Sequence, residues 1–453
     1  MTNLIRNYDG GITSSPAQVV WPSSALEIQA VLRDVWRYPS PVRAMGSYHS
    51  LTPCASSDGT VINMSRMKRI IGIDRDSMTV TAEAGLQFVE ASRALRAQGL
   101  QFRTNIEIGN MTLGAAACCH TKDGLDGSEF GQVGSYLTKM KWVTPAGELA
   151  EVSEESDPSL LRFMRSSYGL AGVIYEVTFR IKPLEVVHFS YLPRRIEDLT
   201  EREVDDILDA STGLVCWTVG HRAHFQMRRR ADKAGPFASL FAATRQRLWN
   251  RSEAWAGRFI DGRIPTRLLR NAAHDAWFAG SKLLLSALWA TGGATLYNPD
   301  KTIDYSKTPA SAKYAFTFWA FPRRQWLATL REYLEFSERH FRKYDFRCNM
   351  ALGSYFIRKD TNALLSYSHD GDIFSIDPIH AYTDKPAWDT FLKEFNDFAY
   401  ARNGIPLLNQ SPFVQKQHVE AAYGARWAEF SARVRQMDPN GRMLNPFFAA
   451  LLA

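Results

Sequence analysis

The stretch 41–50, with the sequence PVRAMGSYHS, places residue types that can bind a phosphate next to a histidine. Its alternating apolar residues predict a short strand that runs into a turn at Gly46. A glycine turn lets backbone N–H groups approach an anionic ligand closely, and Ser47 and Ser50 add hydroxyl groups. His49 would then lie beside that ligand. The alternative is a surface turn in which the histidine has a purely structural place.

Two further glycine-containing stretches lie far from this turn in the sequence. They are Thr112–Ala117 and Ser167–Thr178, and each can bring backbone close to a large ligand. Hydrophobic spacing predicts that strands and helices alternate through residues 16–184. We expect strands at 42–44, 61–64, 78–84, 137–143 and 173–181, and helices at 23–33, 88–98 and 160–165.

The character of the sequence changes near residue 185, which predicts a second domain. The segment 236–290 is rich in Arg and Trp, so it is either an amphipathic surface helix that meets lipid or a core helix with a basic solvent face. The apolar window 276–297 resembles a weak membrane span, but its lysine and glycines favour a helix of the second domain. Further strands are expected at 186–191, 214–219, 313–321 and 349–356, helices at 326–341 and 387–401, and a turn cluster at 438–446.

Composition limits the class of protein. With 45% hydrophobic and 22% charged residues the chain is globular, and a net charge of +7 over 453 residues is too mild for a nucleic-acid-binding protein. That charge suits an anionic ligand or an anionic surface. Five cysteines without paired metal spacing predict neither a metal site nor disulfides, and the N-terminus lacks a secretory apolar segment. We therefore expect a cytoplasmic protein.

Several motifs, taken in order, resemble the FAD-binding domain of the vanillyl-alcohol-oxidase superfamily (the PCMH type), and within it the aldonolactone and alditol oxidases. The resemblance covers residues 16–184 and 405–450 and is only general between them. No GxGxxG turn follows the first strand, and the sequence holds no P-loop, HExxH or GxSxG motif. The motifs that carry the resemblance are GSYHS at 46–50, DG at 58–59, VINM at 61–64, TVTAEAG at 79–85, TLGAA at 112–116, GLAGVIYEVTFRIKP at 169–183, FVQKQH at 413–418 and DPNGRMLNPF at 438–447.

The resemblance implies an α+β fold. It consists of a two-subdomain FAD-binding domain and a substrate or cap domain made of an antiparallel sheet with covering helices. The implied limits are 1–184 for the FAD-binding domain, 185–404 for the cap domain, and 405–453 for a C-terminal segment that returns to the flavin.

FAD is the implied cofactor, bonded covalently through His49 to the flavin 8α-methyl group. A neutral imidazole nitrogen suits that bond. Relatives with a second covalent bond carry a cysteine where this chain has Asn110, so Cys118 and Cys119 are expected to be small buried hydrophobic residues. Tyr48 departs from the glycine of the family. The other cofactor-binding residues that the resemblance implies are Gly46, Ser47, Tyr48, Ser50, Thr112, Gly114, Thr121, Gly172, Ile174 and Asn445.

Catalytic candidates come from the same resemblance. Lys416 matches the family lysine near flavin N1, where a cation would stabilise the reduced flavin and help to accept the hydroxyl proton. The alternative for Lys416 is a surface lysine. His418 and His120 are further catalytic candidates.

The substrate pocket is expected to differ from that of the polyol oxidases. Phe318 and Asn349 stand where those enzymes carry acidic substrate-binding residues, and Tyr355 is a further substrate candidate. Aromatic residues at 316, 318, 319, 321 and 355 favour an apolar alcohol over a free polyol. Alternation along a strand also allows half of these rings to fill a core instead.

The expected function is transfer of a hydride from a CH–OH or similarly activated carbon of a small molecule to flavin N5. O2 or another acceptor would take the electrons, and neither a metal nor a nucleic acid is expected. The first alternative is a noncovalent, membrane-associated dehydrogenase of a lipid-linked sugar that serves as an epimerase component. In that case the basic, Trp-rich helices would supply a peripheral membrane contact. The second alternative is a non-enzymatic flavoprotein.

Overall fold

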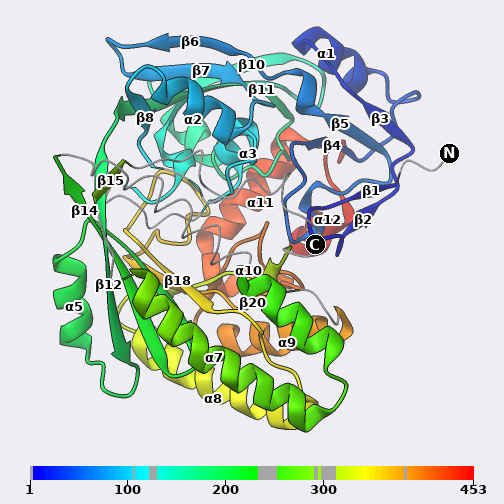
Figure 1. The fold of residues 1–453 in the computed structure, drawn as a ribbon. Coiled ribbons are helices and arrows are strands. Elements are labelled where there is room, and N and C mark those ends of the chain that lie inside the picture. The colour runs from blue at the N-terminus through cyan, green and yellow to red at the C-terminus, as the bar shows by residue number, and fades with distance from the viewer. Residues whose placement is uncertain are drawn as a thin grey trace.

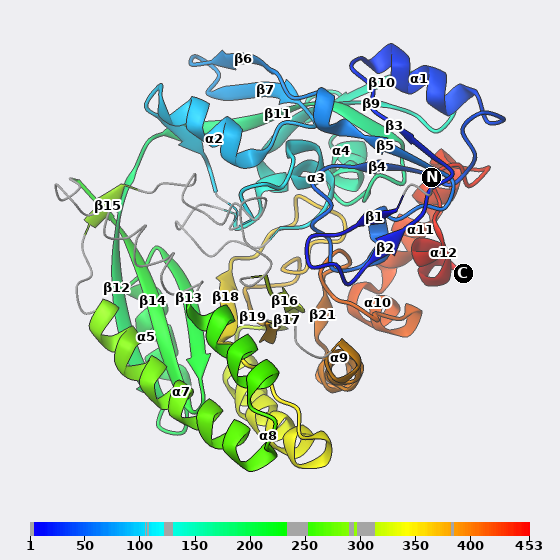
Figure 2. The ribbon, with the colours of Figure 1, turned by 45° about the vertical axis from the view of Figure 1, so that its right-hand side comes forward.

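A computed structural model describes residues 4–104, 106, 108–121, 130–232, 252–289, 294–296, 313–381 and 385–453. Three larger sheets organise these residues, with three, six and eight strands (Figure 1). The mixture of helices with largely antiparallel sheets confirms the expected α+β class. Figure 2 shows the six-stranded sheet at one end of the molecule and the eight-stranded sheet at the other.

The first sheet is parallel, and one of its strands ends at the 46–50 turn. Its order is β3 (Gln18–Val20), β5 (Thr60–Asn63) and β4 (Val42–Met45). Ligands commonly bind beyond the carboxyl ends of parallel strands, which is where this turn lies. The connecting elements are the hairpin β1 (Ile5–Arg6) and β2 (Thr13–Ser14), α1 (Ala25–Arg33) with its expected Ser24 cap, and 3-10 turns at Pro53–Ala55 and Met64–Arg66.

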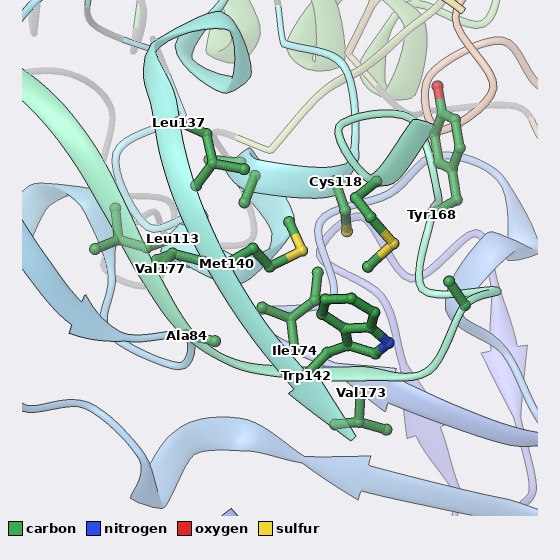
Figure 3. Packing of buried hydrophobic residues seen from close by; sticks show 14 of the residues in the cluster. Ala84, Leu113, Cys118, Leu137, Met140, Trp142, Tyr168, Val173, Ile174 and Val177 are labelled. Carbon is green, nitrogen blue, oxygen red and sulfur yellow. The ribbon is translucent and has the colours of Figure 1, made fainter. Parts of the chain in front are cut away.

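The second sheet is antiparallel and supports the other glycine-rich stretches. Its order is β10 (Leu149–Ser153), β9 (Leu137–Val143), β11 (Val173–Pro183), β7 (Thr79–Glu83) and β6 (Ile70–Asp74), with β8 (Leu100–Phe102) on the end of β11. Figure 3 shows side chains of β9 and β11 packed with Leu113 and Cys118 in the core of this part. The other elements are α2 (Phe88–Arg96), α3 (Leu113–Cys118), a 3-10 turn at Val133–Tyr136 and α4 (Pro158–Met164).

The third sheet is antiparallel and belongs to the second half of the chain. Its order is β15 (Ala294–Leu296), β12 (Val186–Arg195), β14 (Arg222–Ala231), β13 (Gly213–Val219), β18 (Leu352–Ile357), β19 (Ile373–Ile376), β17 (Trp319–Pro322) and β21 (Ile405–Pro406). β16 (Ala315–Phe316) and β20 (Ile379–His380) form a separate pair. The helices of this half are α5 (Glu201–Asp209), a helix over 252–263, α7 (Arg267–Trp289), α8 (Trp326–Tyr344) and α9 (Lys385–Tyr400).

The two faces of the eight-stranded sheet differ in chemistry. One face contributes Leu214, Cys216 and Phe225 to an apolar core shared with α5, α8 and α9. Residues that alternate with these point to the other side, because successive strand side chains alternate between faces. We call that side the inner sheet face; by register it carries Tyr191, Trp217, His224, Gln226, Arg228 and Tyr355.

The C-terminal segment returns to the first sheet. α11 (Ala425–Met437) and α12 (Pro446–Leu452) lie beside the N-terminal strands, and α10 (Lys416–Tyr423) lies next to β21 (Figure 2). The expected turn cluster lies between α11 and α12, where the Asp438 carboxylate accepts the N–H groups of Arg442 and Met443 at 2.7 Å each. The Val42 N–H donates to the Arg442 carbonyl at 2.8 Å, so this turn is bonded to β4. The division of the chain at 184 and 404 stays a prediction.

The Arg- and Trp-rich segment 236–290 is helical over 252–263 and 267–289, while residues 233–251 and 290–293 lie outside the described residues. Only part of the apolar window 276–297 is therefore described, as the second half of α7 and β15. Among the helices of the described ranges, none is both long enough and apolar enough to cross a membrane.

Candidate cofactor site

A cavity lies where the 46–50 turn, α3 and the 168–174 loop meet. The space between its walls, open solvent included, is about 950 Å³. The structure brings together most of the expected cofactor-binding residues at this cavity. Those that line it are Gly46, Ser47, Tyr48, His49, Ser50, Thr112, Gly114, Gly172 and Ile174.

The turn at 46–50 is held tightly against α3. A Cβ at Gly46 would overlap the Thr112 side chain, so only glycine fits there. Tyr48, at the position where related chains have glycine, adopts the left-handed backbone with φ 49°. Its hydroxyl forms a hydrogen bond with the Ser56 hydroxyl at 2.6 Å. This bond holds Tyr48 in a backbone conformation that bulky residues rarely adopt. The departure from the family pattern therefore leaves the turn intact.

His49 lies half-buried at one end of the turn, under the ring of Tyr8, and its Nε2 atom is fully buried. The two ring centroids are 4.3 Å apart and the planes are nearly parallel. The backbone N–H of Tyr8 donates to the Tyr48 carbonyl at 3.1 Å, and Asn7 Nδ2 donates to the Ser50 carbonyl at 3.0 Å. The N-terminal hairpin thus holds the turn on both sides of His49.

The environment of His49 keeps its imidazole neutral. Burial lowers the pKa of His49 to about 3, and the Lys313 cation contributes in the same direction. Lys313 Nζ donates to the Tyr8 carbonyl at 2.7 Å, which fixes this cation near the histidine. A neutral imidazole offers a nucleophilic nitrogen at every pH at which the protein would be handled.

Two other glycines let backbone approach the cavity from the second sheet. A Cβ at Gly114 would crowd Ala84, and the Gly114 N–H donates to the Ala84 carbonyl at 2.8 Å. A Cβ at Gly172 would overlap the Val143 carbonyl, and Gly172 has φ +125°, which side chains rarely tolerate. Sterics therefore require glycine at each position that the sequence singled out.

Arg43 is a buried cation in the cavity wall that the sequence analysis missed. Its guanidinium donates to the carbonyls of Tyr168, Gly169, Cys54 and Met443 and so joins β4 to three separate segments. Burial lowers the pKa of Arg43 below its usual range. Position 43 lies inside a strand of otherwise apolar residues. A charged residue within such a strand is the signal that could have identified Arg43.

Asn409 and Gln410 also line the cavity, and the sequence analysis did not single them out. Asn409 Nδ2 donates to the His120 carbonyl at 3.3 Å, while the Leu51 N–H donates to the Asn409 carbonyl at 2.9 Å. Among the described residues, no group donates to the side-chain oxygen of either amide, although both are buried. Buried polar atoms of this kind are normally satisfied, so they fit a ligand with hydrogen-bond donors.

Thr121 and Asn445 support the site from outside the cavity. Thr121 is buried, and its carbonyl accepts the Tyr367 hydroxyl at 2.6 Å. Asn445 caps α12, and its Nδ2 donates to the carbonyls of Pro53 at 3.0 Å and Ser56 at 2.9 Å. Both residues hold segments that border the 46–50 turn and do not line the cavity themselves.

The structure does not bring the expected catalytic residues together. Lys416 is the first residue of α10, with its side chain half exposed and 3.6 Å from Glu420, because the buried face of α10 begins at His418 and Val419. His418 Nδ1 accepts the Gln415 N–H at 3.2 Å and so caps the helix. Neither residue lines the cavity, so the expected position of Lys416 near the cofactor is not observed.

His120 is buried beneath the cavity wall. Its Nδ1 and the Gln132 Oε1 lie 2.8 Å apart, and its Nε2 lies 3.3 Å from the Ser166 hydroxyl. Burial lowers the pKa of His120 to about 4, so the ring is neutral. The two ring nitrogens therefore join His120 to Gln132 and Ser166, while its backbone carbonyl accepts Asn409 Nδ2. Lys122, two residues further along the chain, lies outside the described residues.

The expected substrate residues are fully buried and do not line the cavity. Phe318 packs on Tyr367 with ring centroids 4.9 Å apart, and Tyr355 lies edge-on to Trp217 at 6.2 Å on the inner sheet face. Asn349 Nδ2 donates to Asp261 Oδ2 at 2.7 Å. The aromatic residues of this region divide between clusters, with Trp319 and Phe321 in the core shared with α8 and α9. Alternation therefore removes two of the five rings from the expected pocket.

The cysteines of α3 lie at the cavity wall. Cys118 is buried and Cys119 is half-buried, with their sulfurs 3.9 Å apart, and all five cysteines of the chain are reduced. Among the described residues, no group of His, Cys, Asp or Glu side chains is arranged to hold a metal ion.

Part of the chain that lines this cavity is similar to known proteins. Residues 16–153 match the family described as FAD binding domain. The chain is 29% identical over 213 residues to L-gulono-1,4-lactone dehydrogenase of Mycobacterium tuberculosis, covering 47% of this chain and 48% of that one. It is 20% identical over 456 residues to L-gulonolactone oxidase of Scyliorhinus torazame, covering 97% and 96%. The match thus spans about half the length of the mycobacterial relative.

A solved structure agrees over the whole chain. A variant of cholesterol oxidase from Brevibacterium sterolicum superposes with a TM-score of 0.74 at 14% identity, covering 100% of this chain and 97% of that one. At this identity the likeness concerns the fold, and it confirms the expected PCMH-type arrangement. Residues 16–153 therefore match an FAD binding domain, and the chain as a whole has the fold of the cholesterol oxidase structure.

Proposed function

We propose that this chain is an FAD-dependent oxidoreductase that takes a hydride from a CH–OH or similarly activated carbon, with His49 as the covalent attachment point of the flavin. The observation that carries the proposal is the cavity itself. Three separate stretches bring backbone to it through Gly46, Gly114 and Gly172, and a half-buried neutral histidine lies at one end. That combination suits a long dinucleotide bonded at its redox-active ring.

Each wall of the cavity has a role toward FAD. When bound, FAD supplies the ring that accepts the hydride. The N–H groups and hydroxyls of residues 46–50 would hold the pyrophosphate, while Ile174 and Gly172 would border the dinucleotide. The His49 nitrogen would carry the bond to the 8α carbon. Asn409 and Gln410 would accept hydrogen bonds from donors on the cofactor or the substrate.

An apolar cluster beside the turn supports an apolar substrate. Ile108 lines the cavity and belongs to the same cluster as Leu51, Phe316, Met350 and Ile379. The cluster extends from the turn toward the cap domain. A free polyol would leave its hydroxyl groups without partners against such a surface, whereas an apolar alcohol would not.

Glu253 is the proposed proton acceptor in place of Lys416. It is buried next to Ala254, which belongs to the same apolar cluster, and its carboxylate accepts the backbone N–H of Ala351. Burial raises the pKa of Glu253 to about 7, which suits a group that takes a hydroxyl proton near neutral pH. The backbone bond holds the carboxylate in one orientation.

The test is anaerobic reduction of the bound flavin, which is measured as the loss of its absorbance near the visible maximum. An apolar secondary alcohol is compared with a free alditol and with an aldonolactone. The proposal predicts bleaching by the apolar alcohol at concentrations where the alditol has no effect. Bleaching by the alditol or the lactone alone would reject the apolar substrate class. No bleaching by any donor, together with a stable photoreduced flavin in air, would favour a non-enzymatic flavoprotein.

A second candidate is a membrane-associated dehydrogenase of a lipid-linked sugar, with noncovalent FAD and a quinone-type acceptor. The exposed leucines of α7 favour it, since an enzyme that takes its substrate from a membrane needs such a surface. Acid denaturation separates the candidates, because noncovalent flavin leaves with the supernatant. An enzyme of this second kind would also reduce a quinone dye far faster than O2.

A further inference from the structure

The solvent side of α7 is apolar along its described length. Leu268, Leu269 and Leu283 are 78%, 61% and 75% exposed. Ala272, Ala276, Ala279 and Gly280 are exposed between them. These positions recur every three or four residues, so they lie on one face of the helix. Asp275 interrupts this face, and its carboxylate is paired with Arg347 at 2.9 Å.

The opposite side of α7 already has its partners within the protein. His274 is buried, with Nε2 2.5 Å from Asp261 Oδ1, and Phe278 packs against the cluster of Val219 and Ala351. The exposed leucines are therefore additional to the packing that holds the helix in place. A helix that only covered a core would be expected to present charged residues outward.

α8 shows what an ordinary solvent face looks like in the same region. Figures 1 and 2 both place α7 and α8 at the end of the molecule remote from β6 and β7. The exposed positions of α8 are mainly charged: Arg331, Glu332, Glu335, Glu338, Arg339, Arg342 and Lys343. The contrast shows that the apolar face is specific to α7 and is not a general property of this region.

The neighbouring helix has the other features of a lipid-facing surface. On the helix over 252–263, the exposed rings of Trp255 and Phe259 stack with centroids 5.2 Å apart. Arg263 and Arg267, both exposed, lie on either side of the three-residue connection to α7, and Arg267 Nε also lies 3.0 Å from Asp345 Oδ1. Exposed aliphatic and aromatic side chains beside cations, in a chain of net charge +7, complement an anionic bilayer.

We propose that the outer face of α7, together with Trp255 and Phe259, docks on an anionic lipid surface. The leucines and aromatic rings would enter the headgroup region, while Arg263 and Arg267 would meet lipid phosphates. The inference does not depend on the oxidoreductase activity, because it concerns exposed side chains that do not line the cofactor cavity.

Vesicle sedimentation of the full flavin-loaded protein tests the proposal. The probes are vesicles of equal parts phosphatidylglycerol and phosphatidylcholine, compared with phosphatidylcholine alone. Binding to the anionic vesicles is expected to weaken as salt is raised, since the arginines contribute through screened charge. The double variant Leu268→Glu, Leu283→Glu is expected to bind at least about tenfold more weakly, because it removes two inserted leucines.

The matched control is the double variant Ala328→Glu, Arg339→Gln on the exposed face of α8, which changes the net charge by the same amount. It is expected to bind within about twofold of the parent, given the small effect of distant surface charges. Flavin absorbance and thermal unfolding verify that every variant is folded. Absence of parental binding at low salt, or equal loss in both variants, would overturn the proposal. So would a parental dimer in light scattering that only the α7 variant dissociates, since a second copy would then cover this face.

Discussion

The cofactor cavity and the inner sheet face meet near Leu51, but their walls are built in opposite ways. Backbone and small side chains line the cavity, and glycine is sterically required at 46, 114 and 172. The inner sheet face instead presents large polar and aromatic side chains, among them Gln226, Arg228 and Tyr355. In the first region the backbone path defines the site; in the second, strand register does.

This difference separates two kinds of specificity. A backbone-lined cavity can bind one large ligand in one way, and it tolerates little change in its walls. A side-chain-lined face can change its ligand with a few substitutions while the sheet stays the same. We therefore expect mutations at the cavity to affect folding and FAD content together, and mutations near the cap to affect turnover while FAD stays bound.

The largest effect is expected from Gly172→Val. The new side chain would overlap the Val143 carbonyl at a backbone angle that valine does not adopt, so unfolding should become easier by about 3–5 kcal/mol and FAD should be lost. Denaturant unfolding and flavin absorbance measure both effects. The control is Gly72→Val in β6, where a Cβ meets no neighbour. Full FAD content in Gly172→Val would show that this wall is not tight.

The next largest effect is expected from Glu253→Gln, which keeps the shape of the side chain. If Glu253 takes the hydroxyl proton, the rate of flavin reduction should fall by about 10²-fold or more while FAD content stays constant. The parental rate should rise with pH through about 7, because the carboxyl must first lose its own proton, and the variant should lose that rise. Glu335→Gln on the exposed face of α8 is the control. An unchanged pH profile would assign the proton to another group.

A smaller, selective effect is expected from Tyr8→Ala. Loss of the ring stacked on His49 would free the imidazole, so the covalently bound fraction of flavin should fall several-fold while total FAD changes little. Tyr8→Phe keeps the ring and should behave like the parent. Acid precipitation followed by flavin fluorescence of pellet and supernatant measures the two fractions. Equal covalent yields in all three proteins would show that the stacking has no role in attachment.

The smallest effect is expected from Lys416→Met. The side chain is half exposed at the N-terminus of α10, where a cation opposes the helix dipole, so stability should change by less than about 0.5 kcal/mol. The rate of flavin reduction should be unchanged. A slow reduction with normal FAD content would instead restore the role that the family resemblance implies for Lys416.

The sequence predicted the cavity better than the cap for a physical reason. At Gly46, Gly114 and Gly172 the contacts forbid a side chain, so residue type alone reveals the backbone path. Arg43, Asn409 and Gln410 were missed because their residue types are common and only the tertiary fold turns them inward. The strands and helices that the sequence predicted lie within a few residues of observed elements, since alternation and helical spacing report burial directly. Other elements, among them β14, α5 and α10 to α12, were not predicted.

The position of Lys416 outside the cavity has a related cause. The motif places a lysine two residues before His418, but α10 starts at Lys416, and the first turn directs that side chain to solvent. The surroundings of the aromatic strand residues near 318 were harder still to predict. A shift of one residue in the strand register decides which ring packs into the core shared with α8 and α9.

The central claim is that the flavin is attached to His49, and peptide mapping tests it most directly. The protein is denatured in acid and digested with trypsin, and peptides that fluoresce as flavin are weighed. The account predicts one flavin-bearing peptide, residues 44–66, which disappears in His49→Ala. Flavin on the peptide over residues 104–122, which contains both α3 cysteines, would contradict the account, as would flavin that leaves entirely with the acid supernatant of the parent protein.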